Sequence, residues 1–126
     1  FQNWLNDKLD SNAKHPAEKL QKLFDYIEEW VTAPEFNGIG FIKASAEFPQ
    51  EDNPVHQLSA EQSLQFREYI KQLAQEANIK DADGLALQLS LLFKGAVQAE
   101  QMKRGSDAMK YAKTAAKILI DGSLSR

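Results

Sequence analysis

Carboxylates are the side chains of this sequence whose spacing first suggests metal chemistry. Asp81, Asp83 and Gly84 resemble half of a calcium loop, in which alternate carboxylates and a glycine wrap the ion. With Gly84 aligned to the required glycine, Ile79 occupies the first ligand position and Ser90 stands where a bidentate glutamate is needed. We therefore expect these aspartates to cap a helix, and we expect no metal and no other cofactor.

Histidines and nucleophiles form no catalytic constellation either. His15 and His56 are far apart, and neither has a second histidine or an acid at ligand spacing. No serine lies in a G-x-S-x-G elbow, and no glycine-rich phosphate loop follows a strand. The sequence contains no cysteine, which excludes disulfides, thiolate metal sites and redox thiols. The chain is expected not to be an enzyme, and a small helical enzyme is only a residual alternative.

Aromatic residues are the more informative set, because they are spread over most segments of the chain. Rings that converge from many helices either fill a core or line a cavity for an apolar ligand, and the sequence leaves both possibilities open. In the second case Ser45 and Tyr69, with Gln65 or Gln88, would orient the ligand. The candidate ligand-binding residues are Trp4, Phe24, Ile27, Phe41, Ser45, Phe48, Phe66, Tyr69, Ile70 and Leu91.

Helical periodicity runs through the chain and predicts an all-α fold. About six helices are expected in an antiparallel, bundle-like domain. Proline at positions 16 and 54 suits the first turn of a helix, and Pro34 ends the helix before it. Segment 41–48 could be a helix or a strand, and we predict a helix because no second strand is available to pair with it. The predicted helices are 1–9, 16–33, 41–48, 54–77, 85–104 and 107–120, the fourth with a possible restart or kink at 59–62.

The last two predicted helices carry more apolar surface than the outside of a small domain needs. Helix 85–104 is apolar on nearly all sides, and helix 107–120 has a stripe of small residues flanked by larger apolar ones. The pair is either the centre of one monomeric core or also the interface of a homodimer. The candidate interface residues are Leu85, Gln88, Leu89, Leu92, Ala96, Ala99, Ala108, Tyr111, Ala112, Ala115 and Leu119.

Composition is that of one ordinary globular domain. The 126 residues suffice for a single core. A net charge of −3 gives no basic footprint for nucleic acid, so this chain alone is not expected to bind DNA. No apolar run approaches the roughly 18 residues of a membrane span, and the lack of cysteine fits a cytoplasmic location. Because Phe1 already lies in a predicted helix, we expect a piece of a longer protein.

The order of residues in 36–49, F-N-G-I-G-F-I-K-A-S-A-E-F-P, is distinctive, and Asn53, Pro54 and Val55 follow it. This stretch resembles the C-terminal domain of tetracycline-repressor (TetR/AcrR-type) transcriptional regulators, in which a helix ending in E-x-W precedes G-x-x-F-x-x-A-x-x-E-F-P. Here Glu28-Glu29-Trp30 stands in that place. The resemblance continues through 85–89 and 121, so it covers nearly the whole chain.

The resemblance implies a regulator in which an N-terminal helix-turn-helix domain, absent from this chain, binds DNA. A linking helix, whose end would be 1–9, joins it to a ligand-binding and dimerisation domain, here 1–126. The resemblance also implies that the last two helices form a dimeric four-helix bundle with those of a partner. We expect a repressor that releases DNA when a small, apolar or aromatic effector enters between the helices and displaces the linking helix. The alternative, from a different class, is a helical protein–protein interaction module without a small-molecule ligand.

Overall fold

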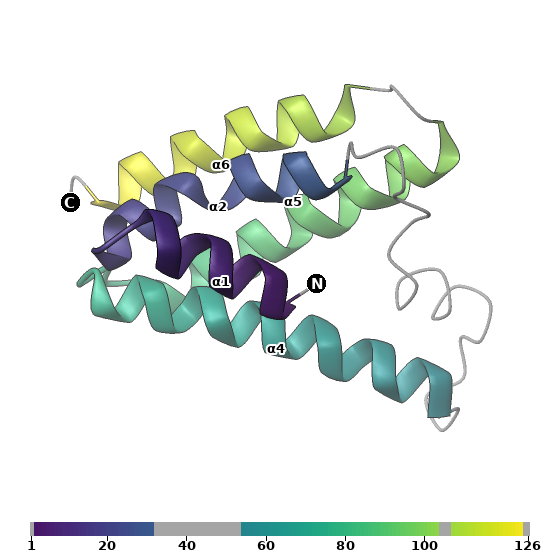
Figure 1. Cartoon of the computed structure of the whole chain (residues 1–126), viewed down its shortest axis with the longest axis horizontal. Coiled ribbons are helices and arrows are strands. Elements are labelled where there is room, and N and C mark those ends of the chain that lie inside the picture. The colour runs from purple at the N-terminus through teal and green to yellow at the C-terminus, as the bar shows by residue number, and fades with distance from the viewer. Residues whose placement is uncertain (1, 32–53, 104–106, 125–126) are drawn as a thin grey trace.

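The computed structural model describes residues 2–31, 54–103 and 107–124, and the regular structure in these ranges is helical throughout. The helices are α1 (Gln2–Asn12), α2 (Pro16–Val31), α4 (Pro54–Glu76), α5 (Ala82–Met102) and α6 (Ala108–Leu124) (Figure 1). The all-α prediction is confirmed, with five helices in the described ranges. The predicted helix 41–48 lies outside the described residues.

Local sequence signals explain where the helices begin. Both α2 and α4 begin at a proline, whose missing N–H is not needed in a first helical turn. At the start of α5, Asp81 accepts a hydrogen bond from the Gly84 backbone N–H at 3.0 Å. This bond satisfies one of the free N–H groups at the helix end and confirms the predicted capping role of Asp81. The region 59–62 does not interrupt α4, which is one continuous helix.

Two helices run further at their C-terminal ends than the sequence predicted, and α5 begins three residues earlier than predicted, at Ala82. In α1, Asn12 donates its side-chain amide to the Lys8 carbonyl at 2.8 Å, and this bond extends the helix into the polar break. In α6, Ser123 donates its hydroxyl to the Leu119 carbonyl at 2.8 Å, and the helix continues to Leu124, which packs against the core. Side-chain hydrogen bonds of this kind satisfy carbonyl groups near a helix end. The apolar pattern of the sequence does not reveal them, so the predicted helices ended too early.

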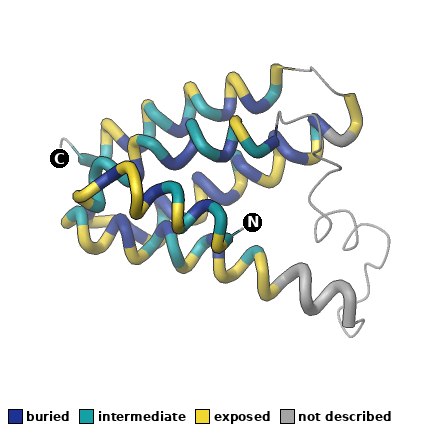
Figure 2. Tube along the Cα trace, in the orientation of Figure 1, coloured by how far each residue is buried: buried dark blue, intermediate teal, exposed yellow. Residues whose placement is uncertain are grey.

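Four of the helices surround one core. α4 packs on α5, α5 on α6, α6 on α2 and α2 on α4, so that these contacts close a ring (Figure 1). α1 packs on α2 outside the ring. Figure 2 shows buried residues along the inward side of each helix and exposed residues along the outward side. None of the described helices is both long and apolar enough to cross a membrane.

The core is apolar and draws on every described helix. α1 contributes Leu5 and Leu9, both fully buried, although it stands outside the ring. Phe24 of α2 and Phe93 of α5 are the largest of the fully buried side chains, each with 1% of its surface exposed. Full burial of a side chain of this size stabilises the fold by about 1.5–3 kcal/mol. Burial of Leu5 and Leu9 therefore binds α1 firmly to the rest of the domain.

Candidate functional site

Most of the predicted ligand-binding residues meet in this core. Phe24 and Ile27 of α2 and Phe66 and Ile70 of α4 are all buried there. Trp4 of α1 and Tyr69 of α4 are partly buried and pack against it. Leu91 is elsewhere, on the outer surface of α5, with 61% of its surface exposed. Phe41, Ser45 and Phe48 lie outside the described residues, and ligand binding by this set stays a prediction.

The α4/α5 seam is fixed by a direct aromatic contact. The rings of Phe66 and Phe93 have their centroids 4.5 Å apart and are tilted by 35°. This separation is at the short end of the range in which aromatic pairs stabilise each other beyond simple area burial. Because the chain turns back between α4 and α5, the contact sets the antiparallel register of the two helices.

Two buried hydroxyl groups interrupt this apolar interior. Neither Tyr69 Oη nor Ser90 Oγ has a hydrogen-bond partner among the described residues. Ser90 has only 3% of its surface exposed. Burial, followed by the negative charges of Asp10 and Glu76, raises the pKa of Tyr69 to about 12, so its hydroxyl stays protonated at neutral pH. The sequence analysis named Tyr69 as a candidate but missed Ser90, whose signal is a serine inside an otherwise apolar stretch of α5.

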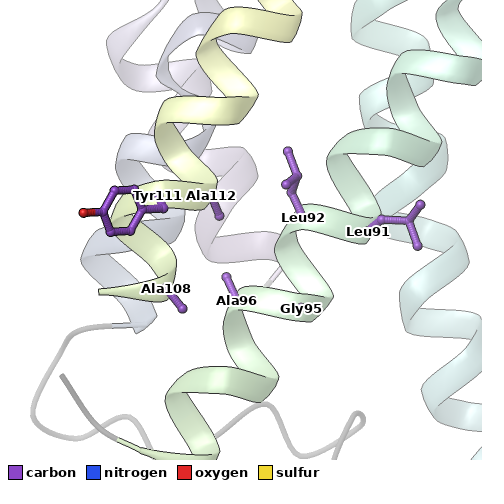
Figure 3. A pocket seen from close by; sticks show the side chains of 7 residues that line it. All are labelled: Leu91, Leu92, Gly95, Ala96, Ala108, Tyr111 and Ala112. Carbon is purple, nitrogen blue, oxygen red and sulfur yellow. The ribbon is translucent and has the colours of Figure 1, made fainter. Parts of the chain in front are cut away.

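A groove runs along the outside of α5 and α6. Its volume is about 340 Å³, and its lining is almost entirely apolar. Leu92 and Ala96 of α5 and Ala108 and Ala112 of α6 line its middle, while Leu91 and Tyr111 lie at its two edges (Figure 3). Gly95 completes the lining. The groove has a floor of small side chains between larger exposed ones.

The exposed apolar residues of α5 and α6 extend beyond the groove. Tyr111 and Ile118 of α6 have 69% and 68% of their surface exposed, and Met102 of α5 has 81% exposed. Glycines lie on the same surface, and a Cβ added at Gly95 or Gly122 would meet no atom within 4 Å. A glycine inside a helix costs about 1 kcal/mol relative to alanine, and the packing of this chain gives neither glycine a reason.

The predicted interface residues fall into two groups in the structure. Leu85, Leu89, Ala96 and Ala112 are buried within the chain's own core. The others are partly or fully exposed: Gln88, Leu92, Ala99, Ala108, Tyr111, Ala115 and Leu119. Homodimer formation by this set stays a prediction. The predicted set, which mixes inward-facing and outward-facing residues, does not contain Gly95, Met102, Ile118 or Gly122.

Charged residues join α6 to α2 on a different side. Lys113 donates to Glu28 at 3.0 Å and lies 3.3 Å from Asp25, and Lys117 donates to Asp25 at 3.2 Å. The hydrogen bond to Glu28 is the largest influence on the pKa of Lys113. Burial opposes it, and with the help of the bond to Asp25 the pKa is raised above its usual value. No group of three or more possible metal ligands is found within 2–31, 54–103 and 107–124.

Comparison with known proteins decides the family. A family model described as "Tetracyclin repressor-like, C-terminal domain" matches residues 16–116, which is most of the chain. The chain belongs to this TetR-like family. The match confirms the resemblance seen in the sequence. Among curated proteins, no sequence matches this chain.

The TetR-like fold is also found in a solved structure. The crystal structure of a TetR-family transcriptional regulator from Streptomyces coelicolor is similar to this chain with a TM-score of 0.76, at 18% sequence identity. The similarity covers 94% of this chain and 61% of that regulator. This chain therefore spans about three-fifths of the length of the regulator that it matches, and the likeness at this identity is one of fold.

Proposed function

We propose that this chain is the effector-sensing and dimerisation domain of a TetR-like transcriptional repressor. The effector is a small, mostly apolar molecule that binds among Phe24, Phe66 and Tyr69 and so alters the position of α1. In the parent protein, α1 continues from a helix-turn-helix domain that binds DNA. Membership of the TetR-like family supports this assignment as a whole.

The observation that carries the sensing part is the burial of α1 in the candidate binding core. Leu5 and Leu9 are fully buried in the cluster that contains Phe24 and Phe66. Polar contacts also hold α1 to α2, with Lys19 donating to Asp10 at 2.8 Å. A molecule that enters this core competes with Leu5 and Leu9 for the same space. Its binding therefore changes the position of α1 relative to α2.

The observation that carries the dimerisation part is the exposed apolar surface of α5 and α6. Monomeric proteins rarely expose a continuous apolar surface unless it binds something. A second copy suits this surface because a two-fold dimer places the same patch on both sides. The large edge residues Leu91 and Tyr111 of one copy then meet the small floor of the other. In this proposal α5 and α6 of two protomers form a four-helix bundle.

The two parts combine into a mechanism for releasing DNA. In a dimer that binds two half-sites, the recognition helices must be about 34 Å apart. A change in the angle of α1 in each protomer alters that separation. A coupling free energy of about 1–3 kcal/mol between effector and DNA is typical of such regulation.

The proposal is tested by separating effector binding from dimerisation. Phe66→Leu keeps an apolar side chain but changes the binding core, so it should lower affinity for any apolar compound that raises the melting temperature of the wild-type chain. The control is Tyr111→Glu, which should weaken the dimer without lowering that affinity. Calorimetry and sedimentation measure the two properties. If each variant affects both properties equally, the assignment of separate surfaces is wrong. A wild-type monomer that binds no small molecule would favour the alternative, a module that docks a helix of another protein.

A further inference from the structure

Ser90 differs from Ser123 and Thr114 in the hydrogen bonding of its hydroxyl group. Ser123 donates to the Leu119 carbonyl at 2.8 Å, and Thr114 donates to the Lys110 carbonyl at 3.1 Å. A bond to the carbonyl four residues earlier is the usual way in which a helix satisfies a serine or threonine. The Ser90 hydroxyl is buried and has no partner among the described residues.

The register of α4 and α5 places Tyr69, the residue with the second unpaired hydroxyl, at the same level along the two helices as Ser90. Phe66 of α4 contacts Phe93 of α5, and the two helices are antiparallel. Tyr69 comes three residues after Phe66, and Ser90 comes three residues before Phe93. Both residues are therefore one helical turn from the ring contact, on the same side of it. Burial of a hydroxyl without a hydrogen bond opposes folding, so two such groups at one level of an apolar seam require an explanation.

The charges around Tyr69 limit what could pair with it. Asp10 and Glu76 are the charged groups that act on its phenol, and both are negative. A negatively charged ligand group would be repelled there. Because the pKa of Tyr69 is raised to about 12, the phenol keeps its proton and can donate it. The Ser90 hydroxyl can donate as well. Each hydroxyl can donate one hydrogen bond, so a neutral carbonyl oxygen, which can accept two, is a ligand group that would satisfy both hydroxyls without the repulsion that an anion would meet.

We propose that the hydroxyls of Tyr69 and Ser90 are the polar anchor of the effector site, and that the effector is a neutral, mostly apolar molecule with a carbonyl oxygen. This inference rests on the proposed function, since it assumes that the core between α4 and α5 admits a ligand. A ketone, amide or lactone has the required acceptor. A carboxylate does not fit, because of the negative charges near Tyr69.

The first test is the stability of the ligand-free chain. Ser90→Ala removes a buried hydroxyl that has no partner, so the melting temperature should rise by roughly 2–5 °C. Tyr69→Phe should act in the same direction. Matched controls are Ser123→Ala, which loses a hydrogen bond, and Tyr26→Phe, at a half-buried tyrosine of α2. The controls should leave the melting temperature unchanged or lower it slightly. A fall in melting temperature for Ser90→Ala would show that protein or water already satisfies the hydroxyl, and would overturn the proposal.

The second test compares two probes with nearly the same skeleton, 1-tetralone and tetralin, of which only the first has a carbonyl oxygen. Titration calorimetry should show that the wild-type chain binds 1-tetralone about fivefold or more tightly than tetralin, as one hydrogen bond predicts. In Ser90→Ala and in Tyr69→Phe this preference should shrink towards one. In Ser123→Ala and Tyr26→Phe it should persist.

The outcomes separate this inference from the proposed function. Equal binding of both probes, in the wild type and in all variants, would overturn the anchor but leave an apolar effector site in place. Binding of neither probe at millimolar concentration, together with unchanged melting temperatures, would overturn the anchor and count against effector sensing as well. A preference for 1-tetralone that survives in both Ser90→Ala and Tyr69→Phe would place the polar contact elsewhere.

Discussion

Helix α5 has two faces that each contain residues of the wrong polarity for their surroundings. On its outer face Leu91 and Met102 are exposed to water, and on its inner face the hydroxyl of Ser90 is buried without a partner among the described residues. Both arrangements oppose the stability of an isolated chain. The two faces suit different partners. The exposed apolar surface suits a second protein surface, and the buried hydroxyl suits one polar atom of a small molecule. One helix therefore lies in both candidate sites and could couple them.

The largest expected effect comes from placing charge on the outer face. The double substitution Tyr111→Glu with Ile118→Glu puts two carboxylates on a surface that the dimer would bury. The two-fold dimer would bury four carboxylates, two from each protomer. At about 2 kcal/mol or more for each, the dissociation constant of the dimer should rise by roughly six orders of magnitude, which leaves a monomer at micromolar concentration. Sedimentation velocity across a concentration series measures it. Lys80→Glu, exposed at the connection before α5, is the control and should change nothing. Dimerisation that survives the double substitution would rule out this surface.

Substitution of a glycine on the outer face should have a smaller effect, which stabilises the monomer but weakens the dimer. Gly95→Ala should raise the stability of a monomeric background by about 1 kcal/mol, because alanine favours the helix and its Cβ meets no atom within 4 Å. The same methyl group should weaken the dimer if a partner helix passes close to Gly95. Gly84→Ala is the matched control and should not stabilise the chain, because its Cβ would displace the Asp81 carboxylate and so break the capping hydrogen bond from the Gly84 N–H. Chemical denaturation and sedimentation measure the two quantities. A dimer strengthened by Gly95→Ala would show that no backbone approaches there.

Burial of the Tyr69 hydroxyl on the inner side should make the stability of the chain fall in alkaline solution. The pKa of Tyr69 is about 12 in the folded chain against 10.0 in its ordinary state, so the unfolded chain loses this proton first as the pH rises. The stabilisation is present below pH 10 and is lost between pH 10 and 12. At pH 11 the loss should be about 1 kcal/mol. Urea denaturation between pH 8 and 11.5 should show a steeper decline for the wild type than for Tyr69→Phe. Parallel declines would mean that the phenol is hydrated.

The smallest effect on stability is expected at the ion pairs between α2 and α6, where charged side chains are partly exposed to water. Asp25→Asn weakens the pairing of Asp25 with Lys113 and Lys117 between α2 and α6. These side chains are partly exposed to solvent, so the loss should be about 0.5–1 kcal/mol and should shrink in 1 M salt, where charges are screened. Thermal denaturation at low and high salt measures it. An effect that is independent of salt would show that lost packing, rather than charge, is responsible.

The sequence predicted the helices well because their signals are local. The apolar stripe of α2, the prolines that begin α2 and α4 and the Asp81 cap each act within a few residues. The inward side of α5 was harder to predict. A helix that is apolar nearly all round does not reveal from its own sequence which side meets α4 and which meets α6. Leu85 and Leu89 therefore entered the candidate interface although they lie in the core, and Gly95 and Ile118 were passed over.

The two unpaired hydroxyls illustrate the same limit. Tyr69 was a candidate from its sequence, because a tyrosine beside Ile70 combines a large apolar ring with a polar tip. Ser90 gave only the weak signal of one serine among leucines, and serines in helices normally bond their own backbone. Their common level on the α4/α5 seam depends on the Phe66–Phe93 contact, a tertiary fact. Residues that are far apart in the sequence become one candidate site only through that register.

Native mass spectrometry of the purified chain tests the central claim most directly, since it weighs the assembly and any retained small molecule together. We expect twice the 14.2 kDa of the single chain at micromolar concentration, and a monomer for the Tyr111→Glu, Ile118→Glu variant. A bound neutral compound should appear as an added mass on each protomer and should be lost on collisional activation. A wild-type chain that stays at 14.2 kDa at this concentration, without any added mass, would contradict the assignment of the outer face to a second copy.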